Sequence, residues 1–354
     1  AISARERIIA DLDAGNQLRG TKEISHSVGH CYKCGSIIEP LLKEQWFVRM
    51  QPLAEAAIEA HKTGKIAFEP TTKAKELATY LAQLHDWNIS RQPAWGIPIP
   101  AFQNVNDPED WIFDTRVEER TIVTDGKTYR RDEDTLDTWF SSGQWPYVVT
   151  DYLSDGSLKR FFPTDLMETG SDLLRAWVSR MIMFSLYRTG EIPFKNVYMH
   201  GMVLDEKGQK MSKSKGNVIN PMEVLSEYGS DALRMGIIAN RSAGQNQAFA
   251  RDKVIAGRNF CNKLWNIARF IEGKVDSSTE AKPTPETIAD HWILSKIDVA
   301  RTTIEKQLEQ FRFAEAADLV YHTIWDDVAD WYLETSKTAP NQPLLLYVLE
   351  TVLK

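Results

Sequence analysis

The sequence predicts an α/β region followed by an α-helical bundle. A strongly apolar helical pattern over 173–187 is followed by a buried strand candidate over 197–203, which indicates the α/β region. A polar segment with two prolines, 276–285, is the best linker in the chain. Beyond this linker, apolar residues recur at helical spacing, which indicates the bundle.

Length and composition indicate a globular protein of several domains. A chain of 354 residues is long enough for about two or three domains, and 43% hydrophobic residues suit packed cores. The formal net charge of −7 argues against wholesale coating of nucleic acid. Any contact with RNA must therefore come from a local basic patch.

The cysteines indicate the redox compartment of the protein, and the two ends of the chain indicate whether it is a fragment. Cys31, Cys34 and Cys261 are odd in number and sparse, which favours a reducing compartment without a disulfide framework. We see neither a signal peptide nor an apolar run of membrane-spanning length, so we expect a cytoplasmic protein with no membrane partner. The chain opens at Ala1 without Met and stops within an apolar helical pattern at 344–349, so we expect a fragment.

The first third of the chain combines helical and strand-like patterns. Ser3 and Glu6 have capping-box spacing at the start of a helix that Gly15 ends. Short stretches broken by Gly, Pro, Asn and Asp over 95–131 are typical of strands. Between these regions we expect helices over 52–60 and 71–84.

The later elements surround a polar loop. Segment 165–188 indicates a short loop and then the apolar helix, and a turn is expected at 205–208. Asn220, Pro221 and Glu223 mark a helix start, with Asn as the N-cap and Glu placed to complete a capping box. Bundle helices are expected at 293–311, at 313–331 and from about Pro343 onward.

The strongest functional signal is the lysine-rich loop Lys210-Met211-Ser212-Lys213-Ser214. Mobile ammonium groups stabilise the negative charge that builds on phosphoryl oxygens and on leaving pyrophosphate during attack on an α-phosphorus. Taken alone, such a loop is more often a solvated hairpin end. Here it lies between a strand end at 198–202 and the helix start at Asn220, and ligands of open α/β sheets collect at the carboxyl ends of strands. We therefore interpret it as a phosphate-binding loop.

The span 197–231, with this KMSKS loop, resembles the catalytic core of class I aminoacyl-tRNA synthetases. Three further segments agree in order and spacing: Asp137-Thr138-Trp139-Phe140-Ser141-Ser142, Thr169-Gly170-Ser171-Asp172 with Trp177, and Ile89-Ser90-Arg91-Gln92 with Trp95-Gly96. Together they resemble the valyl branch over essentially the whole chain. The isoleucyl branch typically carries Asp at the position of Ser141 and lacks this Trp177 context.

The resemblance implies the second half of a Rossmann-type parallel-sheet catalytic domain, followed by an α-helical anticodon-binding bundle. The implied segments are the end of the editing insertion with its C-x-x-C pair (1–45), a connective segment returning to the catalytic core (46–130), the second Rossmann half (131–203), the KMSKS loop with stem-contact helices (204–275) and the start of the bundle (287–354). The first Rossmann half, with its HIGH motif, and most of the editing insertion are expected upstream of residue 1.

The resemblance also implies an ATP site. Lys213 would contact the ATP phosphates with help from Lys210, because lysine supplies compact positive charge. The implied ATP-binding residues are Gly170 and Asp172 at the ribose, His200 and Gly201 at the adenine, and Lys210, Met211, Ser212, Lys213 and Ser214 in the loop, with Lys210 and Lys213 catalytic.

Trp139, Leu173 and Trp177 match the family's apolar wall around the amino-acid side chain. Large rigid groups exclude isoleucine by size, but they cannot strongly reject threonine, which is nearly isosteric with valine. From the residues alone, core packing is the default interpretation of Trp139 and Trp177, and Asp172 equally suits a helix cap. His200 alone would suit a core histidine.

Cys31 and Cys34 have the C-x-x-C spacing of half a zinc knuckle. Four-coordinate zinc needs two more ligands, and the chain offers no second pair. His26 and His30 are close in sequence, but His30 adjoins Cys31 and makes a poor tetrahedral partner. In the resembled family the partner pair lies upstream. Bound Zn2+ and metal-free structural thiols both stay open.

The resemblance implies a ligase that activates valine with ATP and Mg2+ to valyl-adenylate and transfers it to tRNA-Val. The parent is expected to be monomeric, and the fragment is expected to be inactive alone. Two alternatives stay open, a fragment of an isoleucyl-tRNA synthetase and a non-catalytic tRNA-binding module. The Ser141-Ser142 pair argues against the first.

Overall fold

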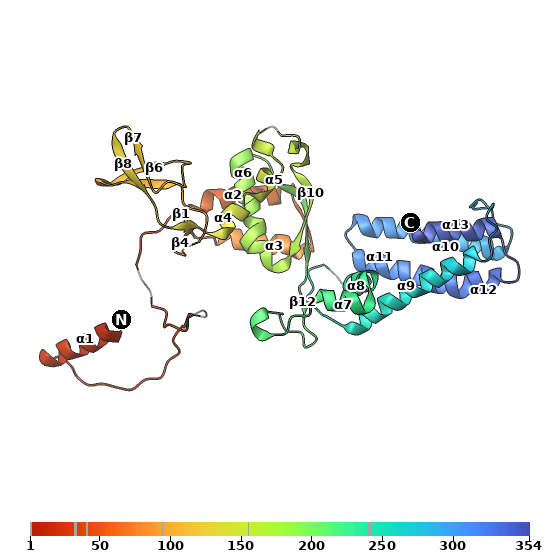
Figure 1. The fold of residues 1–354 in the computed structure, drawn as a ribbon, viewed down its shortest axis with the longest axis horizontal. Helices are drawn as coiled ribbons and strands as arrows, with labels where there is room; N and C mark the ends of the chain where they lie inside the picture. The colour runs from red at the N-terminus through yellow and green to blue at the C-terminus, as the bar shows by residue number, and fades with distance from the viewer. Residues whose placement is uncertain (1, 32–33, 40–41, 94, 155, 240–242) are drawn as a thin grey trace. The chain divides into compact units, whose positions relative to one another are not determined.

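In the computed structural model the chain forms two compact units, residues 1–47 and 48–354, and each is described by itself (Figure 1). The structure describes residues 2–31, 34–39, 42–93, 95–154, 156–239 and 243–354. None of the helices in these ranges is both long enough and apolar enough to cross a membrane.

The first unit holds one helix and an extended segment. Helix α1 (Ile2–Ala14) confirms the expected helix. It begins, among the described residues, at Ile2, so Ser3 lies within its first turn and the expected capping role of Ser3 is wrong. Further on, His30 pairs with Ile37 in an isolated antiparallel bridge.

The second unit opens with helices that the sequence predicted. Helices α2 (Gln51–Lys62) and α3 (Thr72–Ala82) confirm the two expected helices. Their apolar faces are buried, with Ala57 and Leu77 each 1% exposed. The short elements around them and after them are β1 (Phe47–Val48), β2 (Ala67–Glu69), β3 (Trp87–Asn88), β4 (Ser90–Arg91), β9 (Thr135–Leu136), α4 (Thr138–Ser142), α5 (Trp145–Val149) and the 3-10 turns Tyr152–Ser154 and Lys159–Phe161.

A four-stranded antiparallel sheet confirms the strand-like pattern over 95–131. Its order is β6-β5-β8-β7, built from β5 (Ala101–Asn104), β6 (Asp107–Phe113), β7 (Thr121–Thr124) and β8 (Lys127–Arg131). Phe102, Ile122 and Tyr129 form its small core. The Asp110 carboxylate accepts hydrogen bonds from Asn104, Lys127 and Tyr129, and these lower its pKa to about 2.

A three-stranded parallel sheet, ordered β10-β11-β2, confirms the α/β prediction. Strand β11 (Phe194–His200) is the predicted buried strand, shifted toward the N-terminus. Strand β10 (Thr164–Gly170) contradicts the short loop expected there. Its charged residues and 39%-exposed Leu166 obscure the strand pattern, and its conformation comes from pairing with β11, which is remote in sequence.

The predicted apolar helix divides into three parts. These are a 3-10 turn (Ser171–Leu173), a π-helical turn (Leu174–Val178) and helix α6 (Ser179–Thr189). The helix buries Met181, Ile182 and Met183, each at most 1% exposed. Gly190, with φ +76°, ends it in the left-handed conformation that glycine adopts without strain.

The segment after β11 forms the lysine-rich loop and its supporting helices. Its elements are β12 (Val203–Leu204), a 3-10 turn (Lys213–Lys215), α7 (Pro221–Tyr228), α8 (Ser230–Ile238), β13 (Gln247–Ala248) and α9 (Arg251–Glu272). The Asn220 side chain accepts from the Met222 backbone N–H at 3.0 Å, which confirms the N-cap. The Glu223 carboxylate accepts from the Asn220 side-chain amide at 3.3 Å. Glu223 therefore contacts the N-cap residue through the Asn220 side chain.

The C-terminal part is helical, as the sequence predicted (Figure 1). Its helices are α10 (Ile288–Glu309), α11 (Phe313–His322) continuing into a π-helical stretch (Thr323–Tyr332) and α12 (Leu333–Ser336), and α13 (Gln342–Leu353). Together with α9 they share one apolar core, in which Ile293, Val328 and Leu344 are each 0% exposed.

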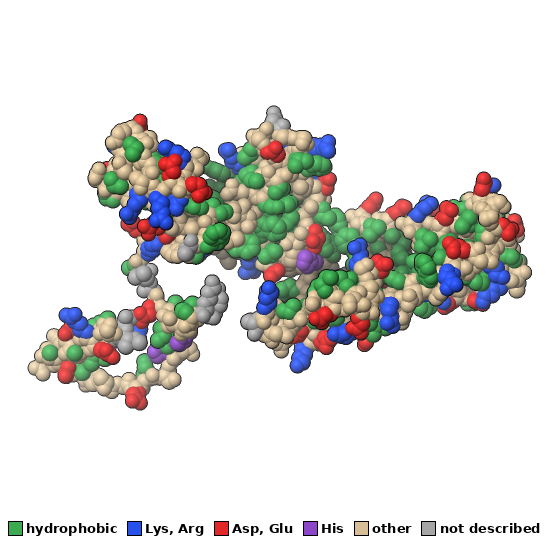
Figure 2. All heavy atoms as spheres, viewed as in Figure 1, with side chains coloured by type: hydrophobic (Ala, Val, Ile, Leu, Met, Phe, Trp, Pro, Cys, Tyr) green, Lys and Arg blue, Asp and Glu red, His purple; other side chains and the backbone are tan. Residues whose placement is uncertain are grey.

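Apolar side chains also gather on the surface over α5 and α6 (Figure 2). Val148 on α5 is 60% exposed and Tyr187 on α6 is 78% exposed. Apolar surface of this extent is typical of faces that other polypeptide covers.

Candidate functional site

The carboxyl ends of β10 and β11 meet at one edge of the parallel sheet. Gly170 and His200 are register partners there, so the residues expected at the ribose and at the adenine lie side by side. A Cβ on Gly170 would lie 2.9 Å from Asp172 Oδ1 and 3.5 Å from His200 Nε2. Glycine therefore leaves room for a carboxylate and an imidazole to approach each other at the strand end.

His200 faces a carboxylate that the sequence analysis missed. Its Nδ1 contacts a carboxylate oxygen of Glu168, which lies on β10. The His200 side chain is 49% exposed, which rules out the core-histidine interpretation. Glu168 precedes Gly170 by two residues and shares its face of the strand, a period-2 signal that could have been used.

Asp172 and Lys210 bring the sheet edge and the lysine-rich loop together. Lys210 Nζ lies 3.5 Å from Asp172 Oδ2. Both side chains are largely exposed, so the ion pair is weak and Lys210 can exchange this partner for a phosphate. Asp172 lies in the first turn of the 3-10 helix that follows β10.

Glycine is required at position 201 because the backbone of another segment of the chain passes close to it. A Cβ at this position would lie 1.7 Å from the backbone oxygen of Gln245, which crosses the end of β11. The crossing segment is held by Asn246, whose side chain accepts from the Met202 backbone N–H at 2.8 Å, and by the pairing of β12 with β13. The sequence analysis expected Gly201 at the adenine, and in the structure the backbone of Gln245 approaches it.

The lysine-rich loop is anchored at its base by Asp205 and Asn217. The Asn217 side-chain amide donates to Asp205 Oδ2 at 2.8 Å and to the Lys210 backbone oxygen at 3.3 Å, while its oxygen accepts from Ser212 N–H at 2.9 Å. Asp205 also accepts from the backbone N–H of Gln209 at 2.7 Å. The hydrogen bond from Asn217, and then that from Gln209, lower the pKa of Asp205.

The loop presents its charged tip to solvent above this base. The Ser212 side chain accepts from Lys215 N–H at 3.3 Å and so caps the 3-10 turn. The Lys213 side chain is exposed. Met211 Sδ accepts from Ile219 N–H at 3.4 Å, and the side chain of Ser214 lies outside the described residues.

We expect Asn217→Ala to loosen the loop without unfolding the sheet. The variant leaves Ser212 N–H and the Asp205 carboxylate without the Asn217 side chain. Amide exchange across 209–216 should become at least roughly tenfold faster, because tenfold corresponds to the loss of one ordinary hydrogen bond and the variant loses three. Hydrogen-exchange mass spectrometry measures this, with Asn196→Ala on β11 as the control. Equal exchange in both variants would contradict the anchoring role.

The three residues of the predicted amino-acid wall lie on three short elements, two of which follow each other directly after β10. Trp139 is on α4, Leu173 on the 3-10 turn and Trp177 on the π-helical turn, and each is partly buried. Trp177 Nε1 donates to the Ser142 backbone oxygen at 2.9 Å, which joins the π-helical turn to the end of α4. Partly buried indoles of this kind are available to a ligand, whereas fully buried ones would serve packing alone.

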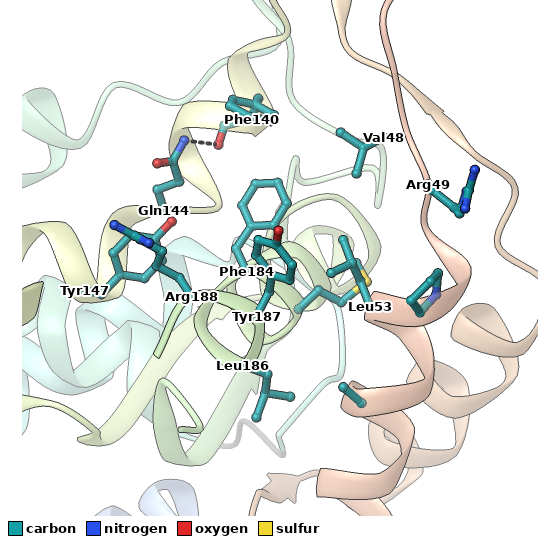
Figure 3. A pocket seen from close by; sticks show the side chains of 13 residues that line it. Val48, Arg49, Leu53, Phe140, Gln144, Tyr147, Phe184, Leu186, Tyr187 and Arg188 are labelled. Carbon is teal, nitrogen blue, oxygen red and sulfur yellow. Dashed lines mark hydrogen bonds between the residues drawn. The ribbon is translucent and has the colours of Figure 1, made fainter. Parts of the chain in front are cut away.

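A groove of about 550 Å³ lies elsewhere, between α2, α5 and α6 (Figure 3). It is lined mainly by apolar side chains, among them Leu53, Phe140 and Tyr187. None of the predicted ATP or amino-acid residues lines it. The candidate site is therefore the sheet edge, where the polar groups converge, and not this groove.

Cys31 and Cys34 form at most half of a metal site. Gly35 N–H donates to the Cys31 backbone oxygen at 2.8 Å. Hydrogen bonding with Ser36 lowers the pKa of the Cys34 thiol to about 7. Across the described ranges, no group of three or more His, Cys, Asp and Glu side chains could hold a metal ion. The described residues therefore do not fit a complete zinc site.

Two family models match the chain. The one described as tRNA synthetases class I (I, L, M and V) matches residues 3–250. The one described as the anticodon-binding domain of tRNA ligase matches residues 290–354.

Curated relatives match nearly all of this chain but less than half of their own length. A valine–tRNA ligase of Syntrophotalea carbinolica is 41% identical over 99% of this chain, and one of Dehalococcoides mccartyi is 37% identical over all of it. The chain spans 41% of each of these relatives. Among solved structures, a Mycobacterium tuberculosis methionyl-tRNA synthetase with methionyl-adenylate is similar over 93% of this chain and 62% of its own (TM-score 0.69, 18% identity). A LeuRS from Agrobacterium radiobacter K84 is similar over 76% of this chain and 39% of its own (TM-score 0.62, 21% identity).

Proposed function

The chain belongs to the class I tRNA synthetases of the I, L, M and V group, and from this premise we propose that it is part of a valine–tRNA ligase. The parent activates valine with ATP to valyl-adenylate and transfers valine to tRNA-Val. We place the parent in the cytoplasm as a monomer. The observation that carries the proposal is the meeting of Gly170, Asp172 and His200 at one sheet edge, with Lys210 of the loop 3.5 Å from Asp172.

The names of the curated relatives support valine as the amino acid. The curated relatives named above are valine–tRNA ligases and match essentially the whole chain. Ser141 supports the same choice over isoleucine, because the isoleucyl branch typically carries Asp at this position.

The proposed roles follow the chemistry of each group. Asp172 accepts hydrogen bonds from the ribose hydroxyls once Lys210 has turned to a phosphate. Lys213 and Lys210 stabilise the charge that develops on the α-phosphoryl oxygens and on pyrophosphate. His200 and Gly201 border the adenine. The wall of Trp139, Leu173 and Trp177 surrounds the valine side chain.

Magnesium would arrive with the nucleotide. The described side chains form no acidic cluster that could hold a metal ion unaided. Mg2+ usually keeps several waters and binds through substrate phosphates, so such a cluster is not needed. When bound, the ion would neutralise part of the phosphate charge, and the lysines of the loop would neutralise the rest of it.

Charging of tRNA tests the proposed function. The whole product of the gene, incubated with ATP and tRNA-Val, should attach radiolabelled valine to the tRNA. Isoleucine with tRNA-Ile should not be joined at a comparable rate. Charging of tRNA-Ile would favour the isoleucyl alternative, and binding of tRNA without any charging would favour a non-catalytic binding module.

We expect Trp177→Ala to relax discrimination against larger aliphatic amino acids. The substitution opens the wall by the volume of an indole, and the fit of one methylene in an apolar pocket is worth about 10- to 200-fold. The valine-to-isoleucine ratio of kcat/KM should therefore fall at least about tenfold. The control is Trp265→Ala on α9, where the indole is 68% exposed. An unchanged ratio in Trp177→Ala would assign this indole to packing alone.

A further inference from the structure

Two short elements carry the indoles of the amino-acid wall, and neither is long enough to fix its own position. Helix α4 spans Thr138–Ser142, and the π-helical turn spans Leu174–Val178. The distance between Trp139 and Trp177 therefore depends on what holds these two elements together. One tie is the hydrogen bond from Trp177 to Ser142 at the end of α4.

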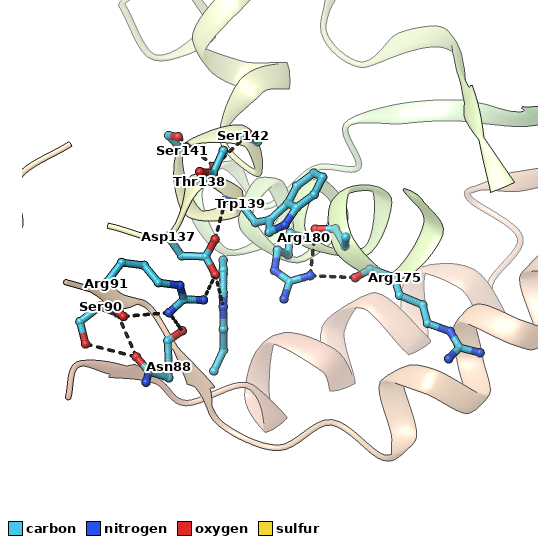
Figure 4. A network of polar contacts seen from close by, with 12 residues as sticks. Asn88, Ser90, Arg91, Asp137, Thr138, Trp139, Ser141, Ser142, Arg175 and Arg180 are labelled. Atoms are coloured by element: carbon cyan, nitrogen blue, oxygen red, sulfur yellow. Dashed lines mark hydrogen bonds and ion pairs between the residues drawn. The ribbon is translucent and has the colours of Figure 1, made fainter. Parts of the chain in front are cut away.

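A second tie begins at Asp137, which is 7% exposed. One carboxylate oxygen accepts from the Trp139 backbone N–H at 3.0 Å and so caps α4. The other accepts from Trp87 Nε1 at 3.2 Å and contacts the Arg91 guanidinium (Figure 4). The start of α4 is thus fixed to a segment 46 to 50 residues earlier in the chain.

Arg180 continues this tie from Trp87 to the π-helical turn. Its guanidinium carbon lies 4.1 Å from the centre of the Trp87 ring. From there, one guanidinium nitrogen donates to the backbone oxygens of Arg175 and Ala176, both at 2.8 Å (Figure 4). A π-helical turn shifts the backbone pairing by one residue, so a side chain that binds its carbonyls stabilises that local geometry.

The surrounding packing leaves little freedom for this arrangement. Trp87 stacks on Phe184 with ring centres 6.1 Å apart. A Cβ on Gly143, which ends α4, would lie 3.0 Å from the Phe184 ring and 3.1 Å from Arg180 Cβ. The end of α4 therefore rests directly on α6 beside the base of the Arg180 side chain.

We propose that Arg180, Trp87 and Asp137 form a positioning relay that sets the separation of Trp139 and Trp177, and with it the size of aliphatic side chain the site accepts. The inference rests on the proposed function and adds residues that lie behind the pocket wall. None of the three needs to touch the amino acid. Their effect appears in selectivity, because the binding of a larger side chain depends on how far the two indoles can move apart.

Amino-acid selectivity of the whole gene product tests the relay. Arg180→Met keeps an unbranched apolar stem but removes the charge over Trp87 and both hydrogen bonds to the π-helical turn. We expect the valine-to-isoleucine ratio of kcat/KM, measured by ATP–pyrophosphate exchange, to fall about tenfold. Most of the change should come from a lower KM for isoleucine. Arg188→Met on the same helix is the matched control, and it should leave the ratio unchanged.

A second variant covers the case in which Arg180→Met fails to fold. Trp87→Phe keeps an aromatic ring under Arg180 and removes the N–H that reaches Asp137, together with one ring of the indole. It should lower the ratio by a smaller factor than Arg180→Met. A parallel loss of activity toward both amino acids, with the ratio preserved in a folded variant, would overturn the relay and leave the proposed function intact. Failure of the wild-type protein to activate valine would overturn both.

Discussion

Lys213→Ala in the whole gene product is expected to slow formation of valyl-adenylate by about 100-fold or more, the usual effect of removing one donor aimed at developing transition-state charge. The Lys213 side chain is exposed on a loop whose base is fixed by Asp205 and Asn217. It can therefore fold over the phosphates while the base stays in place. Single-turnover kinetics of adenylate formation measures the effect.

The affinity for valine should change little in the same variant, because Lys213 acts mainly after the ground state is formed. Lys215→Ala is the matched control, since it removes the same charge from the same 3-10 turn. It should affect the rate far less than Lys213→Ala. Equal losses in the rate and in valine binding would refute the catalytic role of Lys213.

Asp290→Ala is expected to lower the free energy of unfolding of the helical bundle by about 3 kcal/mol or more, since hydrogen bonds to a charged group contribute about 1.5–3 kcal/mol each. Asp290 is 3% exposed. It accepts from the Tyr332 hydroxyl and from the Asn341 side chain, each at 3.0 Å, and from the backbone N–H groups of Glu286 and Thr287. Its removal leaves the two buried side-chain donors and the two part-buried backbone donors without this acceptor.

Urea unfolding followed by tryptophan fluorescence measures this loss. Tyr332→Phe removes one of these hydrogen bonds to the carboxylate and should cost about 1.5–3 kcal/mol. Asp298→Ala, on the exposed face of α10, should stay within about 0.5 kcal/mol of the wild type. If Asp290→Ala is no more destabilised than Asp298→Ala, the buried carboxylate does not hold the bundle together.

Asp290 also makes the stability of the bundle depend on pH. Burial alone would raise the pKa of Asp290, but the hydrogen bonds from Asn341, Glu286 and Tyr332 outweigh it and lower the pKa. The stabilisation is therefore full above the ordinary carboxyl pKa of about 3.9 and is lost as the pH falls through the lowered value. Asp290→Ala should lack this part of the acid response.

Much of the fold follows from local sequence signals. The cap at Asn220 and the apolar spacing of the bundle helices depend on residues within a few positions of one another, and the structure confirms both. Strand β10 depends instead on a partner about 30 residues away, and its own residues alternate weakly. It was therefore expected to be a loop.

The candidate site also has parts that local sequence signals predict and parts that depend on contacts between remote residues. The lysine-rich loop is one continuous segment, so its position after a strand and before a capped helix could be predicted. Glu168 beside His200 and Asp137 beside Trp87 are contacts across 32 and 50 residues. A period of two places Glu168 on the same face of its strand as Gly170, but no spacing in the sequence indicates which residue of a remote segment Glu168 or Asp137 meets, because these pairs form only when the sheet and helices pack. The reason for Gly201 likewise became visible only with Gln245 crossing β11.

The most direct test of the account is valine-dependent ATP–pyrophosphate exchange, measured on this chain and on the whole product of its gene. We predict exchange that depends on valine in the whole product, with isoleucine and leucine far weaker, and none in residues 1–354 alone. Absence of exchange in the whole product with all three amino acids would contradict the proposal that this chain is part of a valine–tRNA ligase.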